Sequence, residues 1–522
     1  MFDLVLCRGL VLDGTGAPAT RADVGVTGGR IAAVGRLAAA QAGIVIDAAD
    51  RYVVPGFIDT HVHADAAILE PTVQLAALRQ GVTTLILGQD GLSFAPATPA
   101  ALAFVTRYFA AINGSHPRLG DGAVTIAELL DTWRGTTAVN TAFLVPHGTV
   151  RFSVLGGAER PPEPGELAEM RRMVERGLAE GAVGLSTGLE YLPGRYAGVA
   201  EVAELSRPVA EAGLPYVTHM RGYGAAAATG FAEARAIGMA AGVAVHISHY
   251  HGPGAALLSM VDDARSGGLD LTFDSYPYLR ACTILAMAAL PRWLDDTDLD
   301  RTVDALSDPT TRRQVIDGLN PDLLHRITLA HVPDPDDGQQ WSWTEGWRLI
   351  DAAAEAGVPP AEFLVDLLVH TRLAASAVIE APPSTDEESM RALLRHPAHM
   401  AGSDGIYVGG HPHPRGWGAF ARLLERHVRE LGDWTWEQAA VHLASHPARR
   451  FGLIDRGIIR PGLAADLAVI DPVTVSDRAD YTSPREVAVG VNDVIVNGVP
   501  VLRDGHLTGN LAGTPLTPRS GG

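Results

Sequence analysis

Short apolar segments alternate with amphipathic stretches through the central part of the chain. Residues 164–180 and 199–212, for example, place apolar side chains at helical spacing between two such segments. This alternation is typical of a parallel α/β fold, and its length favours a (β/α)8 TIM barrel. The candidate buried strands are residues 52–58, 83–87, 140–145, 183–186, 215–218, 243–247, 269–273, 377–379 and 399–402. That set has one strand more than a barrel needs.

The regular alternation breaks at about residues 291–358, which are rich in Asp, Pro and Trp. We interpret them as a subdomain inserted into the barrel. Residues 377–379 either close this insertion or form the seventh strand of the barrel, and the pattern allows both. Trp341, Trp343 and Trp347 either pack a small core of the insertion or belong to a lid over the pocket.

Both ends of the chain read as short strands and turns. Residues 4–6, 31–34 and 44–46 near the start, and 467–470 and 494–496 near the end, are β-rich runs bounded by turn residues. We therefore predict a small β-sandwich domain built from residues 1–54 and 455–510, around a catalytic barrel domain at 55–454. Residues 511–522 are polar and rich in Pro and Gly, and we predict that they form a disordered tail.

Charge and composition restrict the partners. The formal charge is −19 and the chain has no basic stripe, so we expect no nucleic-acid partner. No apolar run reaches membrane-spanning length and the first residues lack the order of a secretory signal, which predicts a cytoplasmic protein without a membrane partner. The two cysteines, Cys7 and Cys282, do not suggest a disulfide framework. The oligomeric state, monomer or homodimer, stays open.

All 41 basic residues are arginine. Without lysine, neither Schiff-base chemistry nor a metal bridge through a carboxylated lysine is available to this protein.

Histidines stand at the ends of several predicted strands. His61 and His63 follow an apolar strand at a spacing of two, so alternation along the strand puts both imidazoles on one face. His219 and His249 each lie at the carboxyl end of another predicted strand, where barrel active sites assemble. Neutral imidazoles brought together in this way suit zinc or a similar cation. His246 lies three residues before His249, so alternation predicts that it faces outward.

Asp404 follows the last predicted strand, in the segment GSDG. A carboxylate beside a metal-activated water can accept a proton from it and return that proton to a leaving amine. Alone, Ser403-Asp404-Gly405 would equally suit a turn or a helix N-cap. Together with the strand-end histidines, Asp404 becomes our candidate for the general base and acid.

These segments resemble a known family. From about residue 4 to 500 the chain is similar to the amidohydrolase superfamily, and most closely to its N-acyl-D-amino-acid deacylase (D-aminoacylase) branch. The segments that carry the resemblance are PGFIDTHVHAD, LGQDGLSFAP, VPHGTVR, GLEYLPGRYA, THMR, ISHYHGPG, DSYPY, GSDG with HPRGWGAF, and FGLIDRGIIRPGLAADLAVID.

The resemblance implies a metal centre. It implies a zinc ion held by one cysteine and two histidines, which match His219 and His249, with the His61/His63 pair forming a second, weaker position. Asp90 stands where the family has the cysteine. A carboxylate is a harder ligand than a thiolate. We therefore expect one or two Zn2+ ions, with Mn2+ or another divalent metal as an alternative.

The resemblance also implies substrate-binding positions. The family lysine that meets the substrate carboxylate is His251 here, and an expected serine is Cys282. Tyr191, Tyr276 and Arg415 keep the family residue, and an arginine can bind a carboxylate through two parallel hydrogen bonds.

His147 matches a family histidine, for which we expect a polarising or positioning role. A buried structural role for His147, and a surface or barrel-closing role for Arg415, are equally open.

The resulting hypothesis is a metal-dependent hydrolase that cleaves the N-acyl amide bond of a small N-acyl substrate, such as an N-acyl-D-amino acid. The alternatives are a cyclic-amide or isoaspartyl-dipeptide hydrolase, a deacylase of a specialised metabolite and a non-catalytic scaffold. The lack of lysine weighs against the first, and the full set of candidate ligands weighs against the last. The altered substrate positions keep the specialised-metabolite deacylase open.

Overall fold

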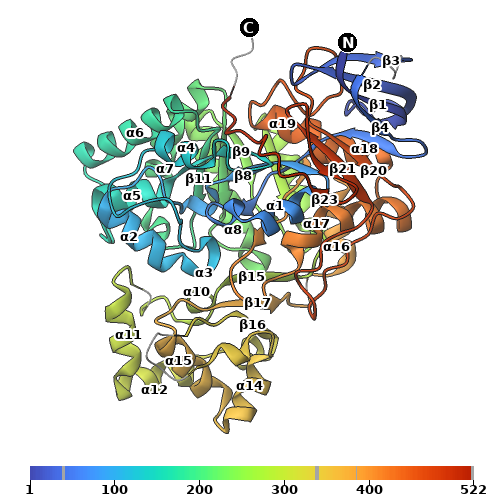
Figure 1. Cartoon of the computed structure of the whole chain (residues 1–522). Helices are drawn as coiled ribbons and strands as arrows, with labels where there is room; N and C mark the ends of the chain where they lie inside the picture. The colour runs from blue at the N-terminus through green and yellow to red at the C-terminus, as the bar shows by residue number, and fades with distance from the viewer. Residues whose placement is uncertain (38–41, 295, 335–339, 384, 519–522) are drawn as a thin grey trace.

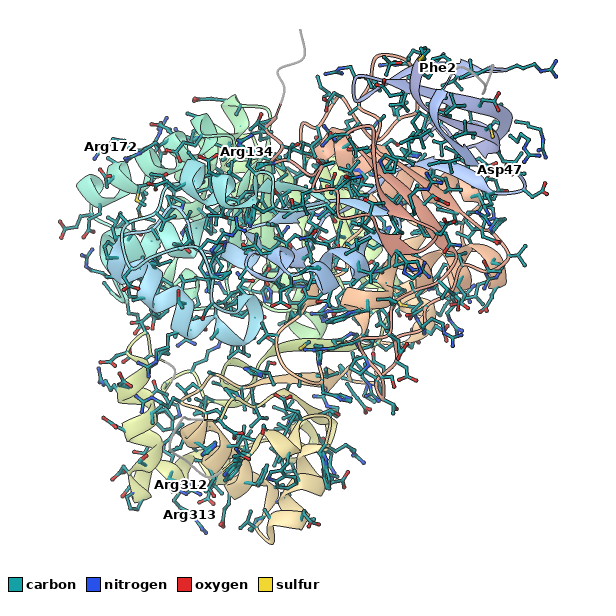
Figure 2. The ribbon with its side chains drawn as sticks, viewed as in Figure 1. Phe2, Asp47, Arg134, Arg172, Arg312 and Arg313 are labelled. Atoms are coloured by element: carbon teal, nitrogen blue, oxygen red, sulfur yellow. The ribbon has the colours of Figure 1, made fainter. Side chains whose placement is uncertain are left out.

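A computed structural model describes residues 1–37, 42–294, 296–334, 340–383 and 385–518. Figure 1 shows three regions: helices surrounding central strands, a sheet that joins the blue and red ends of the chain, and a yellow lobe that projects away from the strands. Exposed arginines such as Arg172 and Arg313 point outward from the helical surfaces (Figure 2). Within the described ranges, no helix has both the length and the apolarity needed to cross a membrane.

A series of parallel strands lies at the centre of the molecule. Its members, in order of pairing, are β6 (Phe57–Asp59), β8 (Val82–Leu87), β9 (Asn140–Phe143) continuing into β10 (Val145–Pro146), β11 (Leu185–Gly188), β12 (Pro215–His219), β13 (Ala244–Ile247), β14 (Leu271–Ser275) and β18 (His399–Ala401). The backbone N–H of Thr60 donates to the carbonyl of Ala401 at 3.2 Å, which links the two ends of this series. All strands of the series therefore point their carboxyl ends to the same side.

Helices connect these strands and pack around them (Figure 1). Buried side chains such as Val245 and Ile247 face the helices, whereas Val217 and Ile86 belong to an inner apolar cluster. The helices between strands are α1 (Pro71–Leu78), α2 (Pro99–Tyr108), α3 (Ala110–Asn113), α4 (Ile126–Trp133), α5 (His147–Leu155), α6 (Pro164–Ala179), α7 (Val199–Glu211), α8 (Ala227–Ala241), α9 (Gly254–Ser266) and α16 (Glu387–Leu394). After β18 come α17 (Arg415–Arg422), η7 (Leu423–Glu430), α18 (Trp436–Ala440), η8 (Val441–Ser445) and α19 (His446–Arg450).

The two ends of the chain meet in one sheet, with the order β23-β22-β21-β20-β5-β1-β2-β3 and with β4 paired to β1. The strands are β1 (Phe2–Val11), β2 (Thr20–Thr27), β3 (Arg30–Gly35), β4 (Ala42–Asp47), β5 (Tyr52–Pro55), β20 (Leu467–Ile470), β21 (Val491–Val496), β22 (Val499–Arg503) and β23 (His506–Leu507). The single strand predicted at residues 52–58 is wrong, because Gly56 divides it into β5 and β6. A Cβ atom at Gly56 would lie 2.1 Å from Thr83 Oγ1, so a residue other than glycine would force the buried Thr83 to move.

The projecting lobe lies between β14 and β18 in the chain. It contains β15 (Arg280–Ile284), α10 (Leu285–Ala289), α11 (Leu299–Ser307), α12 (Pro309–Gly318), α13 (Pro321–Arg326), β16 (Ile327–His331), α14 (Leu349–Ala356), α15 (Pro360–His370) and β17 (Ser376–Glu380). Strand β17 pairs antiparallel with β15 and β16 and with no strand of the parallel series. Residues 377–379 therefore close the lobe and are not the seventh parallel strand. Trp341 stacks on Phe363 within the lobe, whereas Trp343 and Trp347 contact each other at the surface.

The last described residues are ordered against the parallel strands. The N–H of Leu516 donates to the carbonyl of Thr141 at 2.7 Å, and that of Gly513 donates to the carbonyl of Thr137 at 2.9 Å. Leu516 joins the inner apolar cluster with Ile58, among others. The tail predicted at 511–522 is therefore wrong for 511–518, because backbone pairing and one buried leucine outweigh the polar composition. Residues 519–522 lie outside the described residues.

Candidate metal centre

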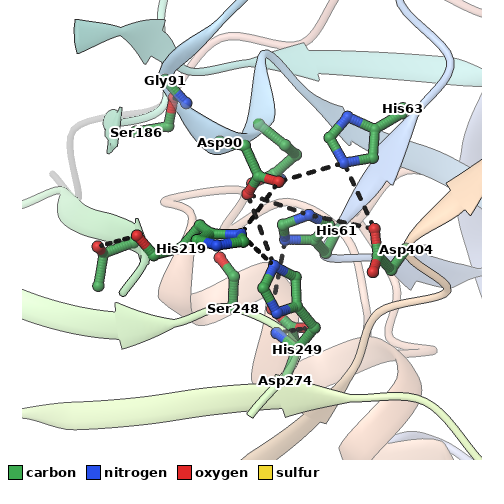
Figure 3. Close-up of polar contacts among 12 residues, drawn as sticks. His61, His63, Asp90, Gly91, Ser186, His219, Ser248, His249, Asp274 and Asp404 are labelled. Carbon is green, nitrogen blue, oxygen red and sulfur yellow. Dashed lines mark hydrogen bonds and ion pairs between the residues drawn. The ribbon is translucent and has the colours of Figure 1, made fainter. Parts of the chain in front are cut away.

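Six side chains gather at the carboxyl ends of the parallel strands (Figure 3). His61 follows β6, and His63 lies in the short strand β7 (Val62–His63). His219 is the last residue of β12, and His249 follows β13 by two residues. The two carboxylates come from the turns after β8 and β18, at Asp90 and Asp404. The structure thus brings together the four histidines and two aspartates singled out from the sequence.

The nitrogen and oxygen atoms of these residues face one another across short gaps. Asp90 lies between two pairs of histidines. Its Oδ1 is 3.5 Å from His61 Nε2 and 3.7 Å from His249 Nε2, while Oδ2 is 3.5 Å from both His63 Nε2 and His219 Nδ1. Asp404 Oδ1 lies 3.4 Å from His63 Nε2 and 3.7 Å from His61 Nε2. Two groups, His61/His63/Asp404 and His61/Asp90/His249, each keep their donor atoms within 4.8 Å of one another.

This geometry fits a divalent cation. Ligand atoms about 2.0–2.2 Å from a tetrahedral zinc ion lie about 3.3–3.6 Å from one another. Both ring nitrogens of His61 and Oδ1 of Asp90 are buried and have no hydrogen-bond partner within the described residues. Buried polar atoms without partners are costly, and a bound cation would satisfy them.

The backbone adopts positive φ angles at three of the six residues. Asp90, His249 and Asp404 have positive φ angles of 56°, 34° and 50°. Residues other than glycine adopt this region uncommonly, and such conformations concentrate at functional sites. For His249 the turn explains an error in the sequence prediction. The prediction for His246 assumes that side chains alternate through residues 248 and 249, but strand β13 ends at Ile247.

His246 consequently faces inward, not outward as predicted. It is in register with Val217, and its ring contacts Phe451 in the inner apolar cluster. Its Nε2 lies 2.9 Å from Asp274 Oδ2.

Burial and the neighbouring charges set the protonation of the histidines. Burial lowers the pKa of His61 to about 4, so that its imidazole is neutral. Burial also lowers the pKa of His63 and His219, but hydrogen bonds and charges of the carboxylates outweigh burial and raise these pKa values to about 9 and about 10. Burial raises the pKa of Asp90, yet the surrounding histidines, above all the charged and hydrogen-bonding His219, hold it well below its usual value. The cluster therefore holds protons that a metal ion would displace.

Two carboxylates that the sequence analysis did not assign hold these histidines in place. Glu190 Oε2 lies 2.9 Å from His219 Nε2, which leaves the Nδ1 atom of His219 facing Asp90. Asp274 Oδ1 accepts a hydrogen bond from the backbone N–H of His249 at 2.8 Å. Such partners fix the orientation of metal-binding histidines. Both residues lie in quoted segments, GLEYLPGRYA and DSYPY, but no spacing rule identifies them.

Asp404 is paired with Arg415. Arg415 Nη2 lies 2.8 Å from Asp404 Oδ2, and the arginine side chain is fully buried. Burial raises the pKa of Asp404, but the charge of Arg415 and a hydrogen bond with His63 hold it well below its usual range. The carboxylate is therefore ionised and able to accept a proton.

A cavity of about 280 Å³ opens beside the six residues. It is lined by His63, Asp90, His219, His249 and Asp404 of the cluster, by Glu190, and by four of the predicted substrate-binding residues, Tyr191, His251, Tyr276 and Cys282. Burial lowers the pKa of His251 to about 4 and raises that of the Cys282 thiol to about 11, so both side chains are neutral near pH 7. The Tyr191 hydroxyl lies 3.1 Å from Thr283 Oγ1.

Arg415 and His147 do not line this cavity. Arg415 lies behind it, with its guanidinium 4.6 Å from the centre of the Tyr276 ring and with Nη2 3.4 Å from the Cys282 carbonyl. Its Nε and Nη1 atoms have no hydrogen-bond partner within the described residues. His147 is fully buried, and its Nε2 lies 2.9 Å from Glu201 Oε1. The structure thus gives His147 a structural partner and no contact with the cavity.

The chain belongs to the amidohydrolase family, whose sequence pattern matches residues 44–502. It is 36% identical to N-acyl-D-glutamate deacylase of Alcaligenes xylosoxydans xylosoxydans, covering 96% of this chain and 93% of that protein. It is 34% identical to D-aminoacylase of the same organism, covering 99% and 97%. The crystal structure of N-acyl-D-glutamate deacylase from Bordetella bronchiseptica, complexed with zinc and a phosphonate inhibitor, superposes with a TM-score of 0.82 at 32% identity and covers 99% of each chain.

These comparisons confirm the resemblance to the D-aminoacylase branch. The protein is a metal-dependent hydrolase of carbon–nitrogen bonds in linear amides, and zinc is the metal that the comparisons support. The cyclic-amide, specialised-metabolite and scaffold alternatives are not favoured.

Proposed function

We propose that this protein removes the acyl group from an N-acyl-D-amino acid. The observation that carries the proposal is the meeting of four imidazoles, Asp90 and Asp404, all of which except His61 line one cavity. The parallel strands that hold these residues constitute, in this proposal, a (β/α)8 barrel domain at 55–454. We assign residues 1–54 and 455–510, whose strands pair in one sheet, to a second domain, which the sequence predicts to be a β-sandwich. We assign the lobe of β15 to β17, of which the predicted insertion at 291–358 is a part, to an inserted subdomain.

The proposed metal ligands are His61, His63, Asp90, His219 and His249. These residues would hold a zinc ion, which would supply Lewis-acid chemistry by lowering the pKa of a water molecule and polarising the scissile carbonyl. Asp90 supplies two oxygens that face different pairs of histidines, so it would be able to contribute to binding one ion or two.

Asp404 is the proposed general base and acid. Its ionised carboxylate accepts a proton from the attacking water and then donates that proton to the leaving nitrogen. Arg415 keeps the carboxylate ionised and orients Oδ2, which leaves Oδ1 toward the histidines. The single proton that Asp404 takes up is the one that it gives back, so the carboxylate is regenerated in each cycle.

Tyr191, His251, Tyr276 and Cys282 are the proposed contacts with the substrate, because their side chains line the cavity. Arg415 acts behind them through Tyr276 and Asp404. We do not propose a substrate contact for His147.

The proposal is tested by elemental analysis of the purified protein followed by hydrolysis assays with paired D- and L-N-acyl amino acids. We expect bound zinc, release of the free D-amino acid and at least tenfold slower release of its L counterpart. Hydrolysis of neither series by protein that contains stoichiometric zinc would refute the proposal. Equal rates on both series would refute its stereochemical part.

A further inference from the structure

A second cavity, of about 200 Å³, adjoins the cavity of the metal centre. The two cavities share four lining residues, His249, His251, Tyr276 and Ala281. At this shared wall the His251 ring stacks on Tyr223, with the ring centres 4.8 Å apart and the planes inclined by 3°. The second cavity therefore lies directly beside the space next to the candidate metal ligands.

The side chains that line only the second cavity are mainly apolar. We call this space the apolar annex and define it by Leu279, Ile379, Ala381, Met390 and Leu393, which come from β17, α16 and the chain beside β15 and β17. Met390 and Leu393 are buried on the inner face of α16. Apolar side chains around an accessible space favour an apolar occupant, because its transfer from water is favourable.

The two arginines at the edge of the annex, Arg280 and Arg326, already contact Glu380. Arg280 Nη2 lies 2.5 Å from Glu380 Oε1, and Arg326 Nη1 donates to the carbonyl of Glu380 at 2.6 Å. The metal-centre cavity itself is lined by three carboxylates, Asp90, Glu190 and Asp404, and by no arginine among the described residues. An acidic substrate side chain would add a second negative charge to that of the α-carboxylate beside these three carboxylates, and Arg280 is already paired with Glu380.

We propose that the apolar annex binds an uncharged alkyl or aryl group of the substrate. This inference rests on the proposed function and adds the chemical class of the substrate. The group belongs either to the acyl chain or to the side chain of the D-amino acid, and the two sources share the chemistry that the annex recognises. Burial of each methylene group in the annex contributes about 0.8 kcal/mol of hydrophobic free energy. This corresponds to about a fourfold gain in kcat/KM.

The test uses the zinc-loaded full-length enzyme and two substrate series. One series lengthens the acyl chain on D-alanine, from N-acetyl through N-butyryl and N-hexanoyl to N-octanoyl. The other keeps the acetyl group and changes the amino acid from D-alanine to D-norvaline, D-leucine, D-phenylalanine and D-glutamate. We expect kcat/KM to rise about fourfold per methylene in one series, which identifies the source, with N-acetyl-D-glutamate below every apolar substrate of its series. A flat or falling trend in both series, or a preference for D-glutamate, would overturn the inference.

A variant that fills the annex isolates its contribution. Ala381→Phe should reduce the gain between the shortest and longest substrates of the responsive series to less than threefold. Ala354→Phe is the matched control, since Ala354 is exposed on α14 and lines neither cavity. Leu279→Asp offers a second variant at a partly exposed position and should have the same effect if Ala381→Phe does not fold. An undiminished gain in a folded annex variant contradicts the assignment.

Binding without turnover separates this inference from the proposed function. In the Asp404→Asn variant, calorimetry should show a dissociation constant that falls along the responsive series, and Ala381→Phe should remove that trend. If the zinc-loaded wild type hydrolyses no substrate but the trend in binding remains, the proposed reaction is wrong and the proposed role of the annex is supported. If hydrolysis occurs without any chain-length trend in rate or binding, the proposed role of the annex is wrong and the proposed reaction is supported.

Discussion

Arg415 Nη2 contacts Asp404 Oδ2 at 2.8 Å inside the protein, where the arginine side chain is fully buried. This ion pair connects a residue behind the cavity with the proposed general base. Because removal of one partner leaves a buried charge without compensation, the pair has consequences for both activity and stability.

Arg415→Met should move the acid limb of the pH profile of kcat/KM to higher pH. The charge of Arg415 lowers the pKa of Asp404, so its removal raises that pKa, and the carboxylate is then protonated and inactive at a pH where the wild type still works. The variant should also lose about 3–5 kcal/mol of stability. Arg415→Lys keeps the charge and should shift the limb less. An acid limb that does not move in Arg415→Met, with zinc content unchanged, would argue against this role.

Asp404→Asn should lower kcat by about 10²- to 10⁴-fold, the range typical of a general acid–base residue. The amide has nearly the shape of the carboxylate but cannot accept the proton. Elemental analysis should show that the zinc bound near Asp90, His219 and His249 is retained. Wild-type turnover in this variant would rule out the proposed role of Asp404.

The part of the site that follows from strand geometry could be predicted from the sequence. His61 and His63 share a face because they are two residues apart, and His219 stands at the end of a strand. The same rule failed for His246, because the turn at His249 interrupts the alternation on which the prediction depended. Alternation is thus informative only up to the residue where the extended conformation ends.

The carboxylates that orient the histidines could not be predicted in this way. Glu190 reaches His219 from another loop, and Asp274 contacts the backbone of His249 from the neighbouring strand. Both contacts depend on tertiary packing and leave no regular spacing in the sequence. The division of residues 52–58 at Gly56 likewise depends on the close approach of Thr83, which is distant in sequence.

Asp90→Cys should shift metal preference toward zinc. A thiolate is softer than a carboxylate, so the ratio of the dissociation constants for Mn2+ and Zn2+ should rise at least tenfold. The apo protein should lose about 1–2 kcal/mol of stability, because Asp90 has a φ of 56° that cysteine adopts less readily. Asp90→Asn tolerates the same backbone and should weaken the binding of both metals. Competition with a chelator measures these constants, and an unchanged ratio in Asp90→Cys would exclude Asp90 as a ligand.

Leu516→Ala should destabilise the protein by about 2–4 kcal/mol, the usual cost of removing a buried leucine side chain. Leu516 packs in the inner apolar cluster with Ile58, Ile86 and Val217. Thr517→Ala is the adjacent control, since Thr517 is exposed and its change should cost less than about 0.5 kcal/mol. Denaturant unfolding of both variants measures the difference. Equal stability of the two would show that residues 511–518 contribute little to the fold in solution.

Glu190→Ala should weaken zinc binding by about 10- to 100-fold, as expected for loss of a carboxylate that orients a metal-binding histidine. The size of the loss should depend on pH. The pKa of His219 is about 10 because the effects of Asp90 and Glu190 exceed that of burial, so removal of Glu190 lowers this pKa. Protons then compete less with the metal, and the difference between variant and wild type should shrink as pH falls from 9 to 6. Glu190→Gln keeps an acceptor near His219 Nε2 and should recover part of the affinity. A loss of affinity that is constant over this pH range would mean that Glu190 supports the fold of the loop and does not act through the His219 imidazole.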